Sequence, residues 1–179
     1  PFMDAGETVE SLLKSADMAM YKAKAAGKNA LRFFDPSMQT EIEQRATVER
    51  ELRNALQAAQ FELYFQPQVD SAGRIFGAEA LIRWRHPNRG LVGPDEFIGI
   101  AEESRLILPI GQWVLTQACR QLALWQKNPD TVHLTLAVNV SALQFRDSDF
   151  VNSVARAIAE SGAPGSRLKL EITESLLLD

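Results

Sequence analysis

Stretches typical of strands and helices alternate through most of this chain, and each expected strand has two unlike faces. Expected strands cover residues 61–66, 75–82, 134–140 and 168–173, and expected helices cover 94–104, 106–126 and 148–161, the last ended by Gly162. Such alternation favours a parallel α/β architecture. Helices cover the apolar faces, so the faces of small or polar residues point into a common interior, as a (β/α) barrel requires. The periodicity alone is also consistent with a doubly wound sheet.

The first two strands form an exception to the parallel pattern. Only a short turn, Asp70 to Gly73, separates them. Strands joined by so short a turn pair as an antiparallel hairpin.

Glu79 lies in the middle of an otherwise apolar strand, and burying a carboxylate without a cation or a hydrogen-bonding partner is costly. Alternation puts Glu79 and Arg83 on one face of this strand. Taken alone, such a pair is more often a structural ion pair than a site. Asn139 and Glu171 lie at equivalent places, toward the carboxyl ends of later strands and on their interior faces. In a barrel these ends meet at one rim, where active sites assemble.

Two carboxylates and an amide oxygen suit Mg²⁺ or Mn²⁺ better than zinc, which prefers His and Cys. His86 and His133 belong to no metal-binding motif, so we interpret them as ordinary core or surface residues. The aromatic rings of Tyr64 and Trp84 are better interpreted as core than as stacking platforms.

The composition is that of an ordinary globular protein with a core. The chain has 179 residues, of which 46% are hydrophobic and 23% charged, and a net charge of −4. This acidic balance gives no reason to expect nucleic acid as a partner. The single cysteine, Cys119, excludes an internal disulfide and is expected to fill the core. No apolar run is long enough for a membrane span, so we expect no direct membrane contact from this segment and a cytoplasmic location.

The first sixty residues read as two helices around a short strand. An amphipathic helix is expected over residues 9–26, a strand over 29–34 and a charged helix over 38–60. Neither proline nor glycine interrupts the second helix, so this linker is expected to be stiff. It would either carry a signal between domains or serve as a spacer.

Four motifs follow one another along the chain: Tyr64-Phe-Gln-Pro67, Glu79-Ala-Leu-Ile-Arg-Trp84, Asn139-Val-Ser141 and Glu171-Ile-Thr-Glu-Ser175. In this order and spacing they resemble the EAL family, bacterial enzymes that hydrolyse the second messenger cyclic di-GMP. The resemblance covers roughly residues 42–179. It implies that residues 61–179 are the N-terminal half of a TIM-like (β/α)8 barrel with an antiparallel first strand.

The resemblance also implies a role for each matched residue. Glu79, Asn139 and Glu171 match metal ligands for Mg²⁺ or Mn²⁺, which would assist the attack of water on one phosphodiester and open cyclic di-GMP to linear pGpG. Glu174 matches an acid that braces the metal-site loop. For the substrate, Arg83 matches a phosphate contact and Gln66 a contact to a guanine edge. Leu91, Pro94 and Phe97 match residues near the guanine pocket.

Residues 1–36 carry a second resemblance. The pattern Ala16-Asp17-x-Ala19-x-Tyr21-x-Ala23-Lys24-x-x-Gly27-Lys28-Asn29 is similar to the end of a GGDEF diguanylate cyclase domain. This resemblance implies that 1–36 is the last helix and strand of such a domain and that 37–60 is a helical linker. The signature of the cyclase is not in this chain, so no cyclase activity is assigned to it.

The parent protein is expected to be either a working phosphodiesterase or a receptor that binds cyclic di-GMP without hydrolysing it. It is also expected to form a homodimer. The family's remaining acidic ligands, its lysine and its general base are expected after Asp179. The 179 residues alone are therefore expected to be an inactive structural fragment that self-associates through open sheet edges.

Overall fold

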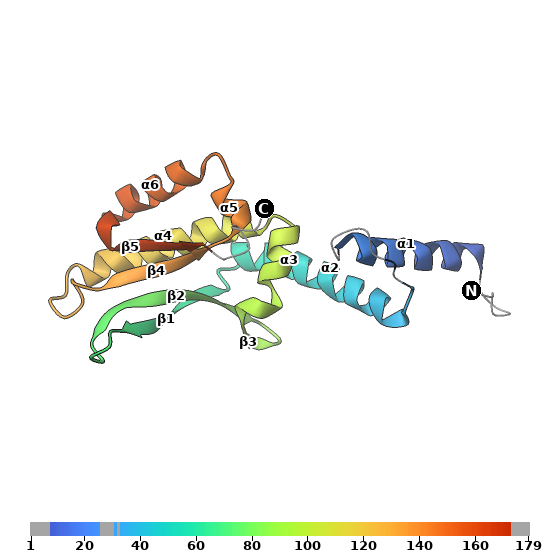
Figure 1. Cartoon of the computed structure of the whole chain (residues 1–179), viewed down its shortest axis with the longest axis horizontal. Coiled ribbons are helices and arrows are strands. Elements are labelled where there is room, and N and C mark those ends of the chain that lie inside the picture. The colour runs from blue at the N-terminus through green and yellow to red at the C-terminus, as the bar shows by residue number, and fades with distance from the viewer. Residues whose placement is uncertain (1–7, 26–30, 32, 173–179) are drawn as a thin grey trace. The chain divides into compact units, whose positions relative to one another are not determined.

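The computed structural model describes residues 8–25, 31 and 33–172 of the chain. The chain divides into two compact units, Pro1–Val48 and Glu49–Asp179. The second unit holds the sheet and all the candidate site residues that the structure describes (Figure 1).

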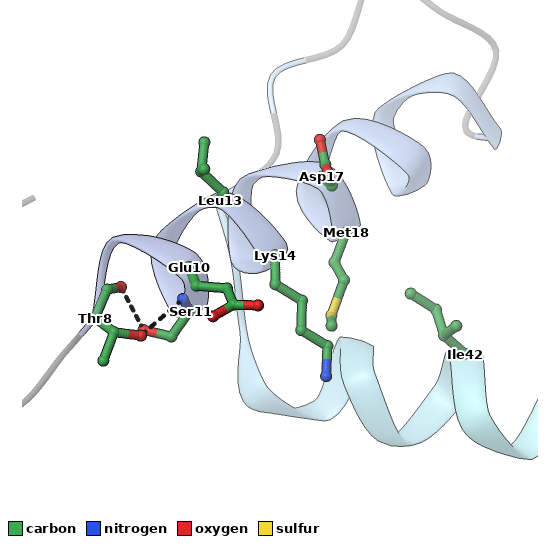
Figure 2. Close-up of a pocket in the computed structure, with 8 residues that line it drawn as sticks. All are labelled: Thr8, Glu10, Ser11, Leu13, Lys14, Asp17, Met18 and Ile42. Atoms are coloured by element: carbon green, nitrogen blue, oxygen red, sulfur yellow. Dashed lines mark hydrogen bonds between the residues drawn. The ribbon is translucent and has the colours of Figure 1, made fainter.

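The first unit contains helix α1, Val9–Ala25, which confirms the helix expected over 9–26. Thr8 caps this helix, because its Oγ1 accepts a hydrogen bond from the backbone N–H of Ser11 at 3.1 Å (Figure 2). Of the strand expected over 29–34, the described residues Leu31, Phe33 and Phe34 are not in a strand, and the others lie outside the described residues.

Helix α2, Pro36–Gln57, is the stiff helix expected over 38–60 and ends three residues earlier than predicted. Its end is set by Ala59, whose φ of 51° is left-handed. The backbone N–H of Gln60 then donates to the carbonyl of Ala55 at 3.1 Å, the bond that closes a Schellman motif. Leu52 and Ala55, in the second half of α2, are fully buried.

The described residues of the second unit form a five-stranded sheet in the order β1-β2-β4-β5, with β3 paired to β2. The strands are β1, Phe61–Val69; β2, Ile75–His86; β3, Gly90–Val92; β4, Thr135–Val140; and β5, Leu168–Ile172. Strand β2 pairs antiparallel with β1 and parallel with β4, which in turn pairs parallel with β5. The α/β class expected from the sequence is confirmed.

Two long helices pack together, and one of them covers β4. Helix α4, Ile107–Trp125, packs on β4, and α6, Phe150–Ser161, packs on α4 (Figure 1). Both match the expected helices over 106–126 and 148–161. Gly162 ends α6 in the left-handed region at φ 69°, as predicted.

The helix expected over 94–104 is wrong as a single element. The segment is a 3₁₀ turn η1, Pro94–Glu96, followed by a short helix α3, Ile98–Glu103. Phe97 separates them with a φ of −133° and is fully buried. Its ring lies 6.0 Å from that of Phe61 and 5.8 Å from that of Trp84, so packing in this aromatic cluster overrides helical continuity.

Ala59→Gly is expected to raise the free energy of unfolding by about 0.5–1 kcal/mol, because glycine adopts the left-handed conformation without strain. Urea unfolding followed by tryptophan fluorescence measures the effect. Ala58→Gly is the control: this neighbour does not have a positive φ, so the substitution should lower stability. Equal effects of the two substitutions would contradict the strain at Ala59.

Candidate functional site

The three candidate metal ligands lie on three adjacent strands. Asn139 of β4 stands directly opposite Glu171 of β5 in the parallel register. Glu79 of β2 stands opposite Ala137, two residues before Asn139 and on the same face of β4. Asn139 Nδ2 donates a hydrogen bond to Glu79 Oε1 at 2.6 Å. The structure therefore brings together the residues that the sequence placed in one cluster.

The donor set fits a hard divalent cation. The Nδ2 of Asn139 donates to Glu79, so Oδ1 is the Asn139 atom that can bind a cation. The carboxylates of Glu79 and Glu171 are half-buried and supply further oxygens. Among the described residues, no group of three His, Cys, Asp or Glu side chains gathers to hold a metal, and the third candidate ligand beside the two acids is the amide of Asn139.

Arg83 lies on the same face of β2 as Glu79, and the described part of the chain shows no ion pair between them. The guanidinium of Arg83 donates to the carbonyl of Ile82 at 2.9 Å and lies 5.7 Å from the ring centre of Tyr64. This arrangement is a cation–π contact and leaves donors of Arg83 for an anion. The structural ion pair considered from the sequence is therefore not formed among the described residues.

The expected core role of Tyr64 is wrong, whereas that of Trp84 is confirmed. Tyr64 is 43% exposed and lies beneath Arg83, and Trp84 is fully buried on the opposite face of β2. Gln66 of β1 pairs directly with Glu79 in the hairpin, so both side chains lie on one face. The substrate candidates Gln66 and Arg83 thus flank the metal candidate Glu79.

A cavity of about 140 Å³ lies between the sheet and α4, on the face opposite the side chains of Glu79 and Glu171. Pro94 and Asn139 border it, and no other candidate metal or substrate residue among those described does. Glu102 of α3 also lines the cavity, and burial, reinforced by the charge of Glu103, raises the pKa of its carboxyl above the usual range. Leu91 is exposed and pairs with Arg85 across the β2–β3 ladder.

Helix α5, Ala142–Phe145, builds the wall of this cavity and was missed in the sequence. Ser141 and Gln144 form a capping box: the Ser141 hydroxyl accepts from the Gln144 amide, and Gln144 Oε1 accepts from the Ser141 amide, both at 3.2 Å. The spacing Ser-x-x-Gln was the signal that could have identified it. The capping box fixes the chain two residues after Asn139.

Comparison with known proteins decides the family. Residues 49–179 match the EAL domain. The chain belongs to the EAL domain family. It is 43% identical over 173 residues to the bifunctional diguanylate cyclase/cyclic di-GMP phosphodiesterase MucR of Pseudomonas aeruginosa, covering 95% of this chain and 25% of the relative. It is also 39% identical over 180 residues to the cyclic di-GMP phosphodiesterase NbdA of the same organism, covering 97% of this chain and 22% of the relative.

A solved EAL structure shows the same fold. The PaMucR phosphodiesterase in complex with c-di-GMP superimposes with a TM-score of 0.71 at 42% identity, covering 74% of this chain and 53% of that one. The sheet and helices thus match an EAL, TIM-barrel-like architecture. The chain spans about a quarter of the length of the two curated relatives and about half of the solved chain.

Other sequence interpretations have mixed outcomes in the EAL domain. Glu174 lies outside the described residues. His86 is buried and His133 exposed, and Cys119 is fully buried, where burial raises the pKa of its thiol. These three assignments agree with the structural roles expected from the sequence. Phe97 belongs to the aromatic core and does not line the cavity.

Two further findings concern the regions away from the site. The hollow in the first unit is lined by Thr8, residues of α1 and Ile42, and none of the predicted site residues borders it (Figure 2). In the described residues, no helix is long and apolar enough to cross a membrane.

Gly111→Ala is expected to destabilise the EAL domain by about 1–3 kcal/mol, because it disrupts buried hydrogen bonds. A Cβ at Gly111 of α4 would lie 1.7 Å from Nε2 of Gln144, a buried side chain held in the capping box. Thermal unfolding measures the loss. Gly99→Ala in α3 meets no atom within 4 Å and should be neutral or stabilising. A neutral Gly111→Ala would show that Gln144 can leave the capping box freely.

Proposed function

We propose that this chain is part of a bacterial signalling protein that hydrolyses cyclic di-GMP to linear pGpG with the help of a divalent metal. The observation that carries the proposal is the gathering of Glu79, Asn139 and Glu171 on adjacent strands, with a 2.6 Å hydrogen bond between the first two. Membership of the EAL domain family and the names of the relatives support it.

Each residue receives a role from its position. Glu79, Asn139 and Glu171 would hold Mg²⁺ or Mn²⁺, which when bound activates water and stabilises the leaving oxygen. Arg83, oriented by the Tyr64 ring, binds a substrate phosphate through its fork of donors. The described residues offer only oxygen donors, and this set suits Mg²⁺ or Mn²⁺ better than zinc.

The remaining assignments complete the substrate site. Gln66, beside Glu79, contacts a guanine edge, and Leu91 and Pro94 lie near the guanine pocket. Glu174 braces the metal-site loop. Because the chain spans about half of the solved EAL chain, we expect the isolated 179 residues to be inactive.

The residues before the EAL domain are proposed to be the end of a GGDEF domain, 1–36, joined by the helical linker 37–60. The alignment with the bifunctional MucR covers 95% of this chain and so includes residues before position 49. A cytoplasmic location and a homodimer complete the proposal. Its partners are then cyclic di-GMP and a second copy of the chain.

A second candidate function is a receptor that binds cyclic di-GMP without hydrolysing it. The solved PaMucR complex shows that a similar EAL domain holds the intact nucleotide. Measuring binding in Ca²⁺ and turnover in Mg²⁺ on the full-length protein separates the two: a receptor binds in Ca²⁺ and shows no turnover in Mg²⁺.

Glu79→Gln is expected to lower turnover of cyclic di-GMP by about 100-fold with little loss of fold, because it removes a charged ligand. The amide oxygen of glutamine can still accept from Asn139 Nδ2, so packing is retained. Turnover in Mg²⁺ is measured on a variant whose circular dichroism matches wild type. The control Glu160→Gln changes an exposed carboxylate of α6 and should be silent. Near-normal turnover by Glu79→Gln would refute the metal assignment.

Arg83→Ala is expected to weaken the affinity for cyclic di-GMP by about tenfold or more, the size of a lost charge-assisted phosphate contact. The Mg²⁺ concentration for half-maximal activity should stay unchanged. Calorimetric titration in Ca²⁺ measures the affinity without turnover. Arg74→Ala, in the β1–β2 turn, removes an exposed arginine that pairs only locally with Asp70 and serves as the control. Unchanged affinity after Arg83→Ala would leave Arg83 a structural residue.

A further inference from the structure

The carboxyl end of α2 is fastened to β2, the strand that carries Glu79 and Arg83. Gln60, just past the Schellman turn of α2, makes two contacts to it. Its side-chain Oε1 accepts from Trp84 Nε1 at 3.1 Å, and its backbone carbonyl accepts from the amide of Arg85 at 2.8 Å. Trp84 is fully buried, so Gln60 satisfies an indole N–H that has no access to water.

A second contact lies earlier on α2. Oε2 of Glu51 is 3.4 Å from Nε2 of the buried His86, the last residue of β2. Nδ1 of His86 accepts from the backbone amides of Asn88 and Arg89, at 3.2 and 3.1 Å. These two hydrogen bonds occupy the lone pair of Nδ1. The ring N–H is therefore at Nε2 and points toward Glu51. His86 thus joins α2 to the turn that leads to Leu91 and Pro94.

The two parts of strand β2 have different hydrogen-bonded neighbours. Residues 77–80, which include Glu79, pair with β1 on one side and β4 on the other. Residues 81–86, which include Arg83, have no partner in β4 within the described register. We call residues 81–86 the outer segment of β2. Its hydrogen-bonded neighbours are β1, the short strand β3 and the residues at the end of α2.

We infer that the carboxyl end of α2 positions Arg83 for its substrate, with Gln60 as the positioning residue, and leaves the metal ligand Glu79 nearly untouched. Trp84 and Arg83 are neighbours on opposite faces of β2, so the anchoring of Trp84 by Gln60 sets the direction of Arg83. Glu79 is fixed by strands on both sides and by Asn139. The inference rests on the proposed function, because it assigns Arg83 to substrate.

The test is Gln60→Met in the full-length protein, which keeps the length of the side chain and removes the acceptor. The KM for cyclic di-GMP, and the Kd in Ca²⁺, should rise three- to tenfold. The kcat and the Mg²⁺ concentration for half-maximal activity should stay within twofold of wild type. Gln60→Glu retains an acceptor for Trp84 Nε1 and should restore the KM. Gln57→Met, an exposed residue on the same helix, is the matched control.

Hydrogen exchange provides a readout that does not depend on activity. In Gln60→Met the backbone amides of residues 81–86 should exchange faster, while those of 77–80 keep their protection. The wild-type turnover tests the proposed function, whereas the ratio of variant to wild type and the exchange pattern test the inference. Equal loss of kcat and metal affinity, or uniform deprotection of all of β2, would overturn it, as would an unchanged KM. If Gln60→Met fails to fold, the same comparison is made with Glu51→Gln, which is expected to have a smaller effect in the same direction.

Discussion

The parallel pairing of β4 between β2 and β5 is the constraint on which the site depends. Side chains alternate along a strand, so only one register puts Asn139 on the same face as Glu79 and opposite Glu171. A slip of one residue would turn Asn139 toward α4 and bring Val138 or Val140 to the site. Both valines are buried on the other face, so such a slip would also expose the core to solvent. Core packing and the placement of the ligands are thus fixed by the same register.

Electrostatics explains why the cluster is built from two acids and an amide. Two half-buried carboxylates on the strands either side of β4 repel one another, and a third carboxylate between them would add to that cost. Asn139 stands between them and donates a hydrogen bond to Glu79, which offsets part of it. A divalent cation would offset the rest, since it attracts both carboxylates and is coordinated by the free amide oxygen of Asn139. Asn139 therefore uses Nδ2 to bind Glu79 in the folded protein and would use Oδ1 to bind the metal.

Much of this could be predicted from the sequence because the alternation of side chains reports burial directly. The faces of β2 and β4 were identified correctly, and so were α4, α6 and the glycine that ends α6. The apolar face of β5, expected beneath helices, is instead exposed at Leu170 and Ile172. The errors arose where tertiary packing decides. Phe97 interrupts the helical pattern because its ring packs in the aromatic core. Tyr64 lies on the face of the sheet opposite that core, where its ring contacts Arg83 and stays partly exposed.

Sequence patterns do not predict contacts between residues that are far apart in the chain. Gln60 is an unremarkable polar residue after a helix, and nothing in its neighbourhood indicates an acceptor for a buried indole 24 residues away. The capping box of Ser141 and Gln144 did have a local signal, which was overlooked because the helix that follows is only four residues long. The short strand β3 left no periodic pattern for the same reason.

The two interpretations of the linker, signal carrier and spacer, now differ in physical terms. Helix α2 begins at Pro36, before the EAL match starts at residue 49, and its last turns bury Leu52 and Ala55 in the core of the second unit. A spacer would end at the domain surface, whereas this helix continues into the fold and holds the outer segment of β2. A small shift of the helix would then reach Arg83 sooner than Glu79, because in the described register Arg83 pairs with a strand on one side and Glu79 on both. Regulation through this helix would act on substrate affinity and leave the metal site in place.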